Sequence, residues 1–419
     1  MIDIRFIREN PGAIRKDLKR RGDRERLPWV DEILENDEKL RKLLKEAQEL
    51  RHRRNTLSSD INSVKKKGLD AKKLLEEAKK IPCRIKEIED ECAALEADIK
   101  SKQMGLPNIL HDSVPEGMEN VTVREKGTKR KFDFEIVSHG EWLESRNLAD
   151  FKRAAKISGS GFYFLKGEAA LLEIAIERLA IDILMKKGFT IIQTPFMMRK
   201  TPYEGVTDLN DFKNVMYKIE EDDLYLIATS EHPIAAMHMG EIFDEKDLPI
   251  KYAGISSCFR KEIGSHGIDT RGLFRVHQFN KIEQFIFSKP EDSWKLHEEM
   301  IANAEEIFSA LELPYRVVNI CTGDIGTVAA KKYDIEIWMP REKEYKEAVS
   351  CSNCTAYQAT RLNVKYRKGE EKEHVHTLNS TAIATSRAIR AIIENCQQKD
   401  GSVKIPKVLV PYMNGIKSI

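Results

Sequence analysis

Apolar residues recur with a seven-residue period through most of the first hundred residues, a pattern typical of helices in a coiled coil. The period breaks at Lys67-Gly68 and then resumes, which predicts an antiparallel hairpin of two helices joined by a short turn. The first helix, from Trp29 to Lys67, would be roughly 58 Å long at ~1.5 Å per residue. Its heptad positions hold Ile33, Leu40, Leu43, Ala47, Leu50, Leu57, Ile61 and Val64, with Arg54 interrupting, and those of the second helix hold Leu74, Ala78, Ile81, Ile85, Ile88, Cys92, Leu95 and Ile99.

Pro82 lies inside the second heptad series, where it removes one backbone donor. The heptads stay in phase on both sides of it, and this favours one kinked helix over two helices that meet there.

The predicted tip of the hairpin is rich in lysine and arginine, while residues 51–73 contain only Asp60 and Asp70 as acids. A solvated coiled-coil face would explain such a charge run. The alternative is a surface that grips the phosphate backbone of a nucleic acid. The candidate contacts are Arg51, Arg53, Arg54, Lys65, Lys66 and Lys67.

Residues 105–117 contain two prolines and two glycines, which predicts a linker between a first domain, residues 1–108, and a second, residues 118–419. In the second domain the heptads give way to a mixture of helical and strand-like patterns. Strands separated by helices, without a regular βαβ rhythm, predict an α+β fold around a mainly antiparallel sheet flanked by helices. Helical periods cover residues 167–188 and 293–311, and strand-like runs cover 132–137, 189–197, 250–259 and 274–288.

Composition narrows the class of protein. Charged residues make up 33% of the chain, above the usual ~25%, but 70 Lys and Arg nearly balance 68 Asp and Glu. Any nucleic-acid site must therefore come from local clustering of charge. Seven scattered cysteines fit a reducing cytosol better than a disulfide framework. The charged start and the absence of a long apolar run predict a cytoplasmic protein without a secretory signal or a membrane span.

A nucleotide, if bound, must be held without the usual glycine-rich loops. The chain has no GxxxxGK[ST] motif, and Gly159-x-Gly161 lacks the third glycine of a dinucleotide site. Residues 258–285 instead read as two strands around a loop, with Arg260 on the incoming strand. A core would not tolerate the unpaired charges of the outgoing strand, so its polar face is predicted to line a site. By the period of two, that face carries Arg275, His277, Phe279, Lys281 and Glu283.

Three segments, residues 167–195, 258–285 and 376–395, resemble motifs 1, 2 and 3 of class II aminoacyl-tRNA synthetases. The spellings FRKE, DTRGLFRVHQFNKIE, TSE (229–231), SCSNC (350–354) and HTLNSTAIATSR are similar to those of seryl-tRNA synthetases. ATSEHP and IKYAGIS resemble the archaeal-type branch, and the heptad hairpin is similar to that family's tRNA-binding arm.

The resemblance implies a homodimeric serine–tRNA ligase that forms seryl-adenylate from serine and ATP and transfers the seryl group to the 3′ end of tRNA(Ser). Because recognition would avoid the anticodon, tRNA(Sec) would also be a substrate where it exists. Motif 1, residues 167–195, would build the dimer interface, and Mg²⁺ would assist ATP. The implied ATP site comprises Arg260 on the α-phosphate, Glu262 on the adenine amino group, Phe279 stacked on adenine, Arg275 and Arg387 on the γ-phosphate, and Glu347 with Ser350 on Mg²⁺. The implied serine site comprises Thr229, Glu231, Arg260, Glu283, Asn379 and Thr381.

Other interpretations compete with this one. Cys351-x-x-Cys354 followed by His374 and His376 has the donors of a zinc site, but the resembled family carries CSNC without a metal role, so no zinc is expected. A ligase that loads a carrier protein would lack the basic hairpin. A catalytically silent, RNA-binding paralogue would have lost Arg260, Glu283 or Arg387.

The chain differs from the usual motif sequences of the family at four positions, and none of these differences removes a catalytic group. They are Ile263, Ala356, Thr360 and Ser386.

Overall fold

The computed structural model describes residues 1–207, 215–262 and 272–419, and it divides the chain into two compact units, Met1–Pro107 and Asn108–Ile419. The departure at Ile263 lies outside the described residues. Within the part described, no helix is both long and apolar enough to cross a membrane.

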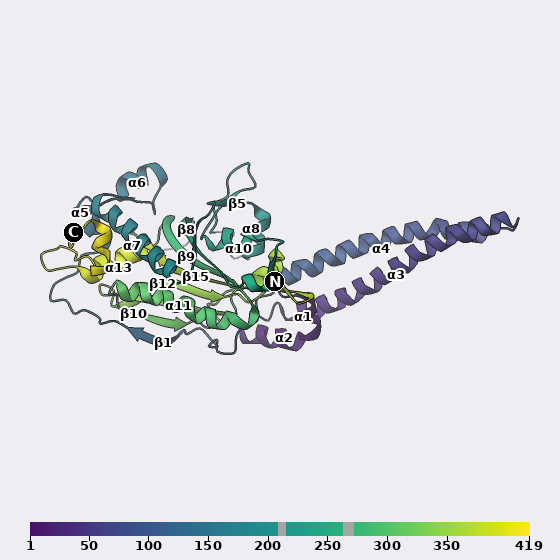
Figure 1. Ribbon diagram of the computed structural model, residues 1–419, viewed down its shortest axis with the longest axis horizontal. Helices are drawn as coiled ribbons and strands as arrows, with labels where there is room; N and C mark the ends of the chain where they lie inside the picture. The colour runs from purple at the N-terminus through teal and green to yellow at the C-terminus, as the bar shows by residue number, and fades with distance from the viewer. Residues whose placement is uncertain (208–214, 263–271) are drawn as a thin grey trace. The chain divides into compact units, whose positions relative to one another are not determined.

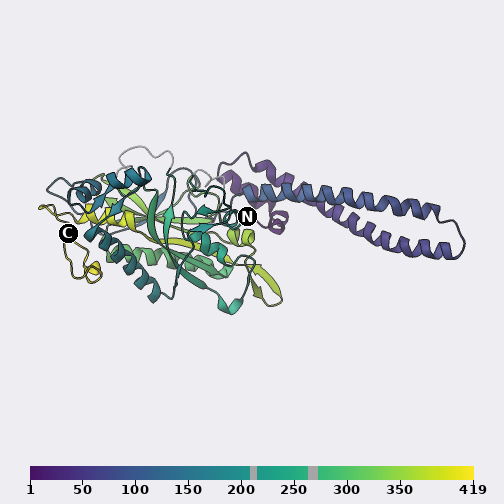
Figure 2. The same cartoon turned by 90° about the horizontal axis from the view of Figure 1, so that it is seen from above.

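The first unit consists of helices, of which the last two form the predicted antiparallel hairpin (Figures 1 and 2). Leu43 and Ala47 of α3 pack with Ile88 and Cys92 of α4, so the heptad positions supply the contact between the two helices. Helix α4 runs continuously through Pro82, which excludes two separate helices at that point. The helices are α1 (Ile4–Glu9), α2 (Pro11–Arg20), α3 (Leu27–Lys66) and α4 (Lys72–Gly105).

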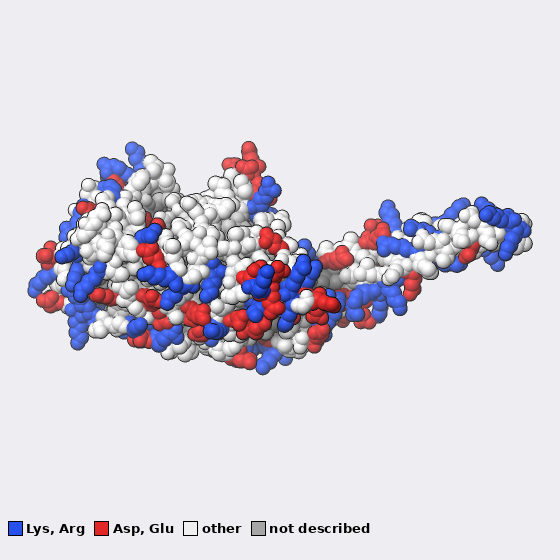
Figure 3. Space-filling model, viewed as in Figure 1, with Lys and Arg blue, Asp and Glu red and all other residues white. Residues whose placement is uncertain are grey.

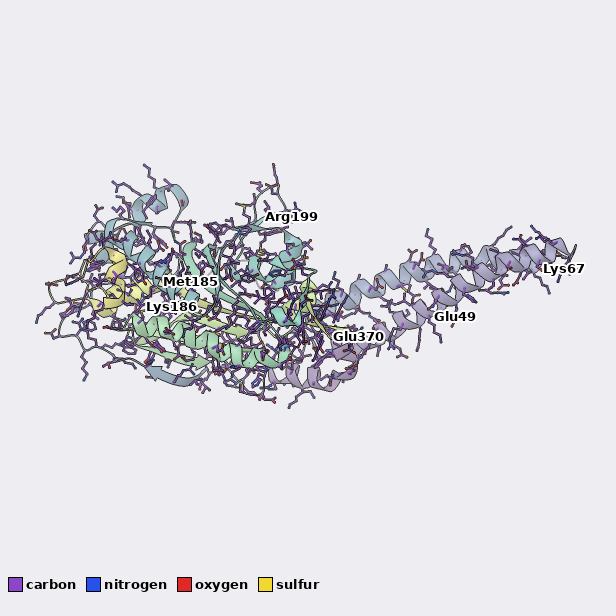
Figure 4. The ribbon with its side chains drawn as sticks, viewed as in Figure 1. Glu49, Lys67, Met185, Lys186, Arg199 and Glu370 are labelled. Atoms are coloured by element: carbon purple, nitrogen blue, oxygen red, sulfur yellow. The ribbon has the colours of Figure 1, made fainter. Side chains whose placement is uncertain are left out.

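Basic side chains gather at the turn between α3 and α4 (Figure 3). Lys67 lies at this turn, whereas Glu49 lies farther back along α3 (Figure 4). Arg51 and Arg53 form ion pairs with acids of α4, Glu89 and Glu77, at 2.7 and 2.8 Å. By contrast, four other exposed residues form no such pair with any described residue, namely Arg54 within α3 and Lys65, Lys66 and Lys67 at the turn.

The second unit is built on a sheet of eight described strands, which confirms the predicted α+β fold with a mainly antiparallel sheet. Only β4 and β8 pair in parallel among the neighbours in this sheet as described. In spatial order the strands are β1 (Val121–Lys126), β10 (Tyr315–Asn319), β11 (Lys331–Met339), β12 (Glu344–Asn353), β15 (His376–Ala384), β9 (Gln278–Ser288), β8 (Ile250–Phe259) and β4 (Thr190–Gln193).

Three amphipathic helices, α7 (Gly167–Lys186), α11 (Ser293–Ala310) and α13 (Thr385–Cys396), pack against this sheet and form its largest apolar core (Figure 1). Strand alternation puts polar side chains on the other face. On β12, Val349 and Cys351 belong to the core, whereas Ser350 and Ser352 line a cavity. The sheet therefore separates the helices from a polar surface that is free to hold a site.

Shorter elements surround the sheet. The remaining helices are α5 (His139–Ser145), α6 (Phe151–Ser158), α8 (Lys200–Val206), α10 (Glu231–Met237) and α12 (Tyr357–Leu362), with single turns η1 (Glu245–Asp247), η3 (Pro290–Asp292), η4 (Lys407–Leu409) and η5 (Pro411–Met413). The remaining strands are β2 (Ala149–Asp150), β3 (Phe164–Leu165), β5 (Met197–Met198), β6 (Tyr225–Leu226), β7 (Ile242–Asp244), β13 (Lys365–Lys368) and β14 (Glu371–His374).

Two sequence patterns take a different form in the structure. Residues 132–137 alternate like a strand but are irregular, because the backbone N–H and C=O of Val137 bond to the side chain of Gln397. From Asn108 on, the predicted linker is packed rather than loose. The side chain of Asn108 donates to the carbonyls of Val328 and Cys354, and Leu110 joins a small apolar cluster of the second unit.

Candidate active site

A cavity of about 550 Å³ opens on the polar face of the sheet. Its walls come from β9, β11, β12 and β15, from residues just after β8, from the first turns of α10 and α13, and from the loop at residues 324–329. Most of the residues predicted for ATP and serine line this cavity. They are Thr229, Glu231, Arg260, Glu262, Phe279, Glu283, Glu347, Ser350, Asn379, Thr381 and Arg387.

Two carboxylates and a lysine form a charged cluster in the site. The ammonium of Lys281 lies 2.5 Å from the carboxylate of Glu283, which also accepts from the hydroxyl of Thr381 at 3.3 Å. Glu231 begins α10, and burial together with the nearby charge of Glu283 raises the pKa of its carboxyl to about 7.

Hydrogen bonds fix the orientation of the Glu231 carboxylate. Its Oε1 accepts from the side-chain amides of Gln358, at 2.9 Å, and Asn379, at 3.1 Å. Gln358 is itself buried and accepts from the hydroxyl of Thr377 at 2.6 Å. One oxygen of Glu231 is thus committed to the protein, and among the described residues no hydrogen bond is made to the other, Oε2.

A second set of charges lies on β12 and α13. Arg387 donates to both the backbone oxygen and the carboxylate of Glu347, at 2.9 and 3.1 Å. The Glu347 side chain is half exposed; partial desolvation opposes its ionisation, yet the guanidinium of Arg387 holds its pKa below the usual value. Asp334, buried beside this pair, responds in the opposite way. Burial and the charge of Glu347 raise its pKa to about 7.

Arg260 follows the last residue of β8 and enters the cavity with its guanidinium 5.3 Å from the ring centroid of Phe279. Its Nε donates to the carbonyl of Ala228 at 3.3 Å. Glu262, two residues later, has a positive φ of 45°, which is uncommon for a residue with a side chain. A cation, an aromatic face and an acid therefore share one wall.

Arg275 is the predicted ATP residue that the structure does not bring into the cavity. Its side chain is exposed, and it precedes β9, which begins at Gln278 rather than at residue 274. His277 also lies outside the strand, stacked on Phe162 with ring centroids 5.2 Å apart. The alternation predicted for β9 holds for Phe279, Lys281 and Glu283, where ladder pairing with β8 enforces it.

Some residues that line the cavity, or that act on the side chains lining it, were not predicted from the sequence. Gln358 and Asp334 act through contacts between distant segments, which no local pattern reveals. Lys332 also lines the wall and donates to the carbonyl of Asp324 at 3.0 Å. The alternation of polar and apolar residues along β11 is the only local signal that could have found Lys332 and Asp334.

The donors considered for zinc have other contacts. Cys354 Sγ accepts from the amide of Asn379 at 3.4 Å, while His374 and His376 contact the carbonyl of Val364 and the hydroxyl of Ser293. Across residues 1–207, 215–262 and 272–419, no group of three or more His, Cys, Asp or Glu side chains is arranged to hold a metal ion.

The antiparallel sheet with a cavity rich in arginine and glutamate defines the class of protein. Residues 215–396 match the family model "tRNA synthetase class II core domain (G, H, P, S and T)", and residues 1–110 match "Seryl-tRNA synthetase N-terminal domain". This is the catalytic core of a class II aminoacyl-tRNA synthetase, preceded by a domain specific to one branch of that class.

Full-length similarities identify the branch. The chain is 62% identical to the serine–tRNA ligase of Methanocella arvoryzae, with 100% of both chains covered. Its structure matches the seryl-tRNA synthetase of Pyrococcus horikoshii complexed with ATP at a TM-score of 0.96, with 50% identity over 100% and 99% of the chains. It also matches a cytoplasmic serine–tRNA ligase of Naegleria fowleri in complex with AMP, at 0.91 and 37% over 100% and 98%. The chain therefore belongs to the seryl-tRNA synthetase family, whose reaction, the ATP-dependent ligation of serine to tRNA, it shares.

Proposed function

We propose that the cavity binds ATP and serine together, and that a carboxylate oxygen of serine attacks the α-phosphorus while pyrophosphate leaves. The resulting seryl-adenylate then loses AMP when the terminal ribose hydroxyl of tRNA attacks its carbonyl carbon. The supporting observation is that one cavity contains the cations Arg260 and Arg387 together with the carboxylates Glu231 and Glu283. Cations suit the phosphates and carboxylates suit the ammonium of serine.

For ATP, Arg260 is assigned to the α-phosphate and to the serine carboxylate, because one anion attacking another needs a cation between them. Phe279 offers a ring face for adenine, and Glu262 accepts from the adenine amino group. Arg387 is assigned to the γ-phosphate. Arg275, whose side chain is exposed in this structure, is proposed to join Arg387 only when ATP has bound.

Mg²⁺ fits the donors present near Arg387. Glu347 and Ser350 are hard oxygen ligands, and Oδ1 of the buried Asp334 has no hydrogen-bond partner among the described residues. Glu347 and Ser350 would hold the ion, which would offset negative charge on the leaving pyrophosphate.

For serine, we assign the ammonium and hydroxyl groups to Glu231, Glu283, Thr229 and Thr381, with Asn379 orienting Glu231. Because Oε1 of Glu231 is already bonded to Gln358 and Asn379, Oε2 is the oxygen available to substrate. Alanine, which lacks the hydroxyl, would leave buried polar groups unpaired and would be rejected on that account.

The hairpin of the first unit is assigned to tRNA(Ser), and to tRNA(Sec) where the cell contains it. The unpaired, exposed residues Arg54, Lys65, Lys66 and Lys67 support a grip on phosphates, and Arg51 and Arg53 would exchange their acidic partners for RNA. The enzyme is further proposed to be a cytoplasmic homodimer that associates through motif 1, residues 167–195.

The test is serine-dependent exchange of pyrophosphate into ATP, followed by charging of tRNA. Arg260→Ala should abolish exchange and leave the melting midpoint unchanged. The matched control is Arg199→Ala, at an exposed arginine at the start of α8 (Figure 4), which should behave as wild type. Near-normal exchange by Arg260→Ala would refute the assignment. Exchange by wild type without charging would favour a ligase that loads a carrier protein.

A further inference from the structure

A buried histidine outside the cavity contacts the part of motif 2 that leads into β9. His139, the first residue of α5, is only 4% exposed, and its Nε2 accepts from the backbone N–H of Leu273 at 3.0 Å. Because Nε2 accepts, the ring proton must lie on Nδ1. Nδ1 donates to the carboxylate of Glu394 at 2.8 Å.

The carboxylate that orients His139 belongs to motif 3. Glu394 lies on α13 and also accepts from Nε of Arg390, one turn earlier, at 3.2 Å. Arg390 reaches from there to Glu342, so its charge is paired on both sides although the side chain is buried. This chain of charge-assisted hydrogen bonds fixes both the tautomer and the position of the imidazole.

The backbone approaches His139 so closely that side chains are excluded. A Cβ at Gly272, where φ is +95°, would lie 2.2 Å from Nε2 of His139. A Cβ at Gly140 would lie 3.3 Å from Cα of Gly272. Glycine at both positions lets α5 contact the segment that contains Gly272 and Leu273. The position of α5 therefore fixes the position of that segment.

The residue after Leu273 connects this contact to the active site. The ring of Phe274 lies under the guanidinium groups of Arg390, at 4.4 Å, and of Arg387, at 5.5 Å. Arg387 is the cavity residue that holds Glu347. A shift of the Leu273 amide would therefore move the aromatic face on which Arg387 rests.

We propose that His139 is a positioning residue for the activation of serine. Through the Leu273 amide it fixes Phe274, and through Phe274 it holds Arg387 in the orientation that receives the terminal phosphate of ATP. The effect should fall on ATP and not on serine, because within the described part of the chain no hydrogen bond joins His139, Leu273 or Phe274 to Glu231 or Glu283. The proposal rests on the assignment of Arg387 to ATP made above.

Two conservative substitutions test the two hydrogen bonds of the His139 imidazole one at a time. In His139→Gln the amide oxygen can replace Nε2 and accept from Leu273, whereas in His139→Asn the shorter amide can replace only Nδ1 and donate to Glu394. We expect the KM for ATP in pyrophosphate exchange to rise about tenfold in His139→Asn and less than threefold in His139→Gln. The KM for serine should stay within twofold in both. The amide of Leu273 should exchange its hydrogen faster in His139→Asn than in wild type.

The matched control is His238→Asn, because His238 is also held between a carboxylate, Glu241, and a second polar group, but lies away from motif 2. It should leave both KM values unchanged. Should His139→Asn fail to fold, Gly140→Ala provides a second test, since its Cβ would crowd Gly272 and displace the neighbouring Leu273 amide, and it should raise the KM for ATP but not the KM for serine.

Equal losses in His139→Asn and His139→Gln, or parallel rises in the KM for ATP and serine, would overturn the proposal. Wild-type kinetics in His139→Asn and Gly140→Ala would do so as well. Failure of the proposed function would look different, because wild type itself would then show no serine-dependent exchange.

Discussion

Replacing Glu231 by glutamine should stabilise the enzyme while disabling it. Burial and the neighbouring Glu283 raise the pKa of the Glu231 carboxyl from about 4.5 to about 7 in the folded state. Above pH 7 the group is ionised in both the folded and the unfolded chain, so the folded chain bears the full unfavourable energy of the buried charge. At 1.36 kcal/mol per unit of pKa, a difference of about 2.5 units corresponds to roughly 3 kcal/mol.

The sign of the pH dependence follows from the raised pKa. As the pH falls from 7 towards 4.5, folded Glu231 takes up a proton before the unfolded group does, and the unfavourable energy disappears. Glutamine is neutral throughout and keeps an oxygen that can accept from Gln358 and Asn379. Glu231→Gln should therefore raise the free energy of unfolding by up to ~3 kcal/mol at pH 8, but by less than about 1 kcal/mol at pH 5.

The free energy of unfolding is measured by urea titration at pH 5 and pH 8, with tryptophan fluorescence as the signal. Three of the four tryptophans, Trp142, Trp294 and Trp338, belong to the second unit and report on it. Glu283→Gln is the matched control. It removes a carboxylate from the same cavity but leaves buried Lys281 without its partner, so it should destabilise by about 3 kcal/mol.

Serine-dependent exchange should fall at least a hundredfold in Glu231→Gln, because the ammonium of serine loses a carboxylate partner. A Glu231→Gln enzyme that is no more stable than wild type at pH 8 would refute the reasoning. An equal gain at pH 5 and pH 8 would show that the stabilisation has another cause.

Three further predictions concern tRNA, metal and serine. Changing Lys65, Lys66 and Lys67 together to alanine should lower the slope of log affinity for tRNA against log salt by roughly 2–3; an unchanged slope with normal pyrophosphate exchange would place the tRNA contact elsewhere. Glu347→Gln should raise the Mg²⁺ concentration for half-maximal exchange about tenfold, measured by magnesium titration, and an unaltered requirement would remove Glu347 from the metal site. Gln358→Leu removes one of the two donors to Oε1 of Glu231 and should lower kcat/KM for serine about tenfold without changing the KM for ATP, so a change in the KM for ATP alone would contradict its assignment.

Periodic patterns predicted the fold well, because packing acts on them directly. The heptads of α3 and α4 face each other, and the limits of β8 agree with residues 250–259. Residues 132–137 alternate in the same way but form no strand, since Gln397, more than two hundred residues later, takes the backbone bonds of Val137. Local alternation cannot reveal such a distant competitor.

In the candidate site, too, residues on a regular strand could be predicted, whereas residues that act through distant contacts could not. Phe279, Lys281 and Glu283 were predictable from the period of β9, because ladder pairing with β8 fixes which face they occupy. Arg275 shares their period but precedes the strand, so the alternation does not apply to it. Gln358 and His139 gave no signal, since each acts by a hydrogen bond to a group more than a hundred residues away.

The central claim is that Arg260, Glu231, Glu283 and Arg387 act on one ATP and one serine in a single cavity. The most direct test is a crystal structure with a non-hydrolysable analogue of seryl-adenylate. We predict Arg260 within hydrogen-bond distance of the phosphoryl mimic, and Glu231 and Glu283 in contact with the ammonium and hydroxyl of the serine moiety. An analogue bound elsewhere, or bound here with those carboxylates turned away from it, would contradict the account.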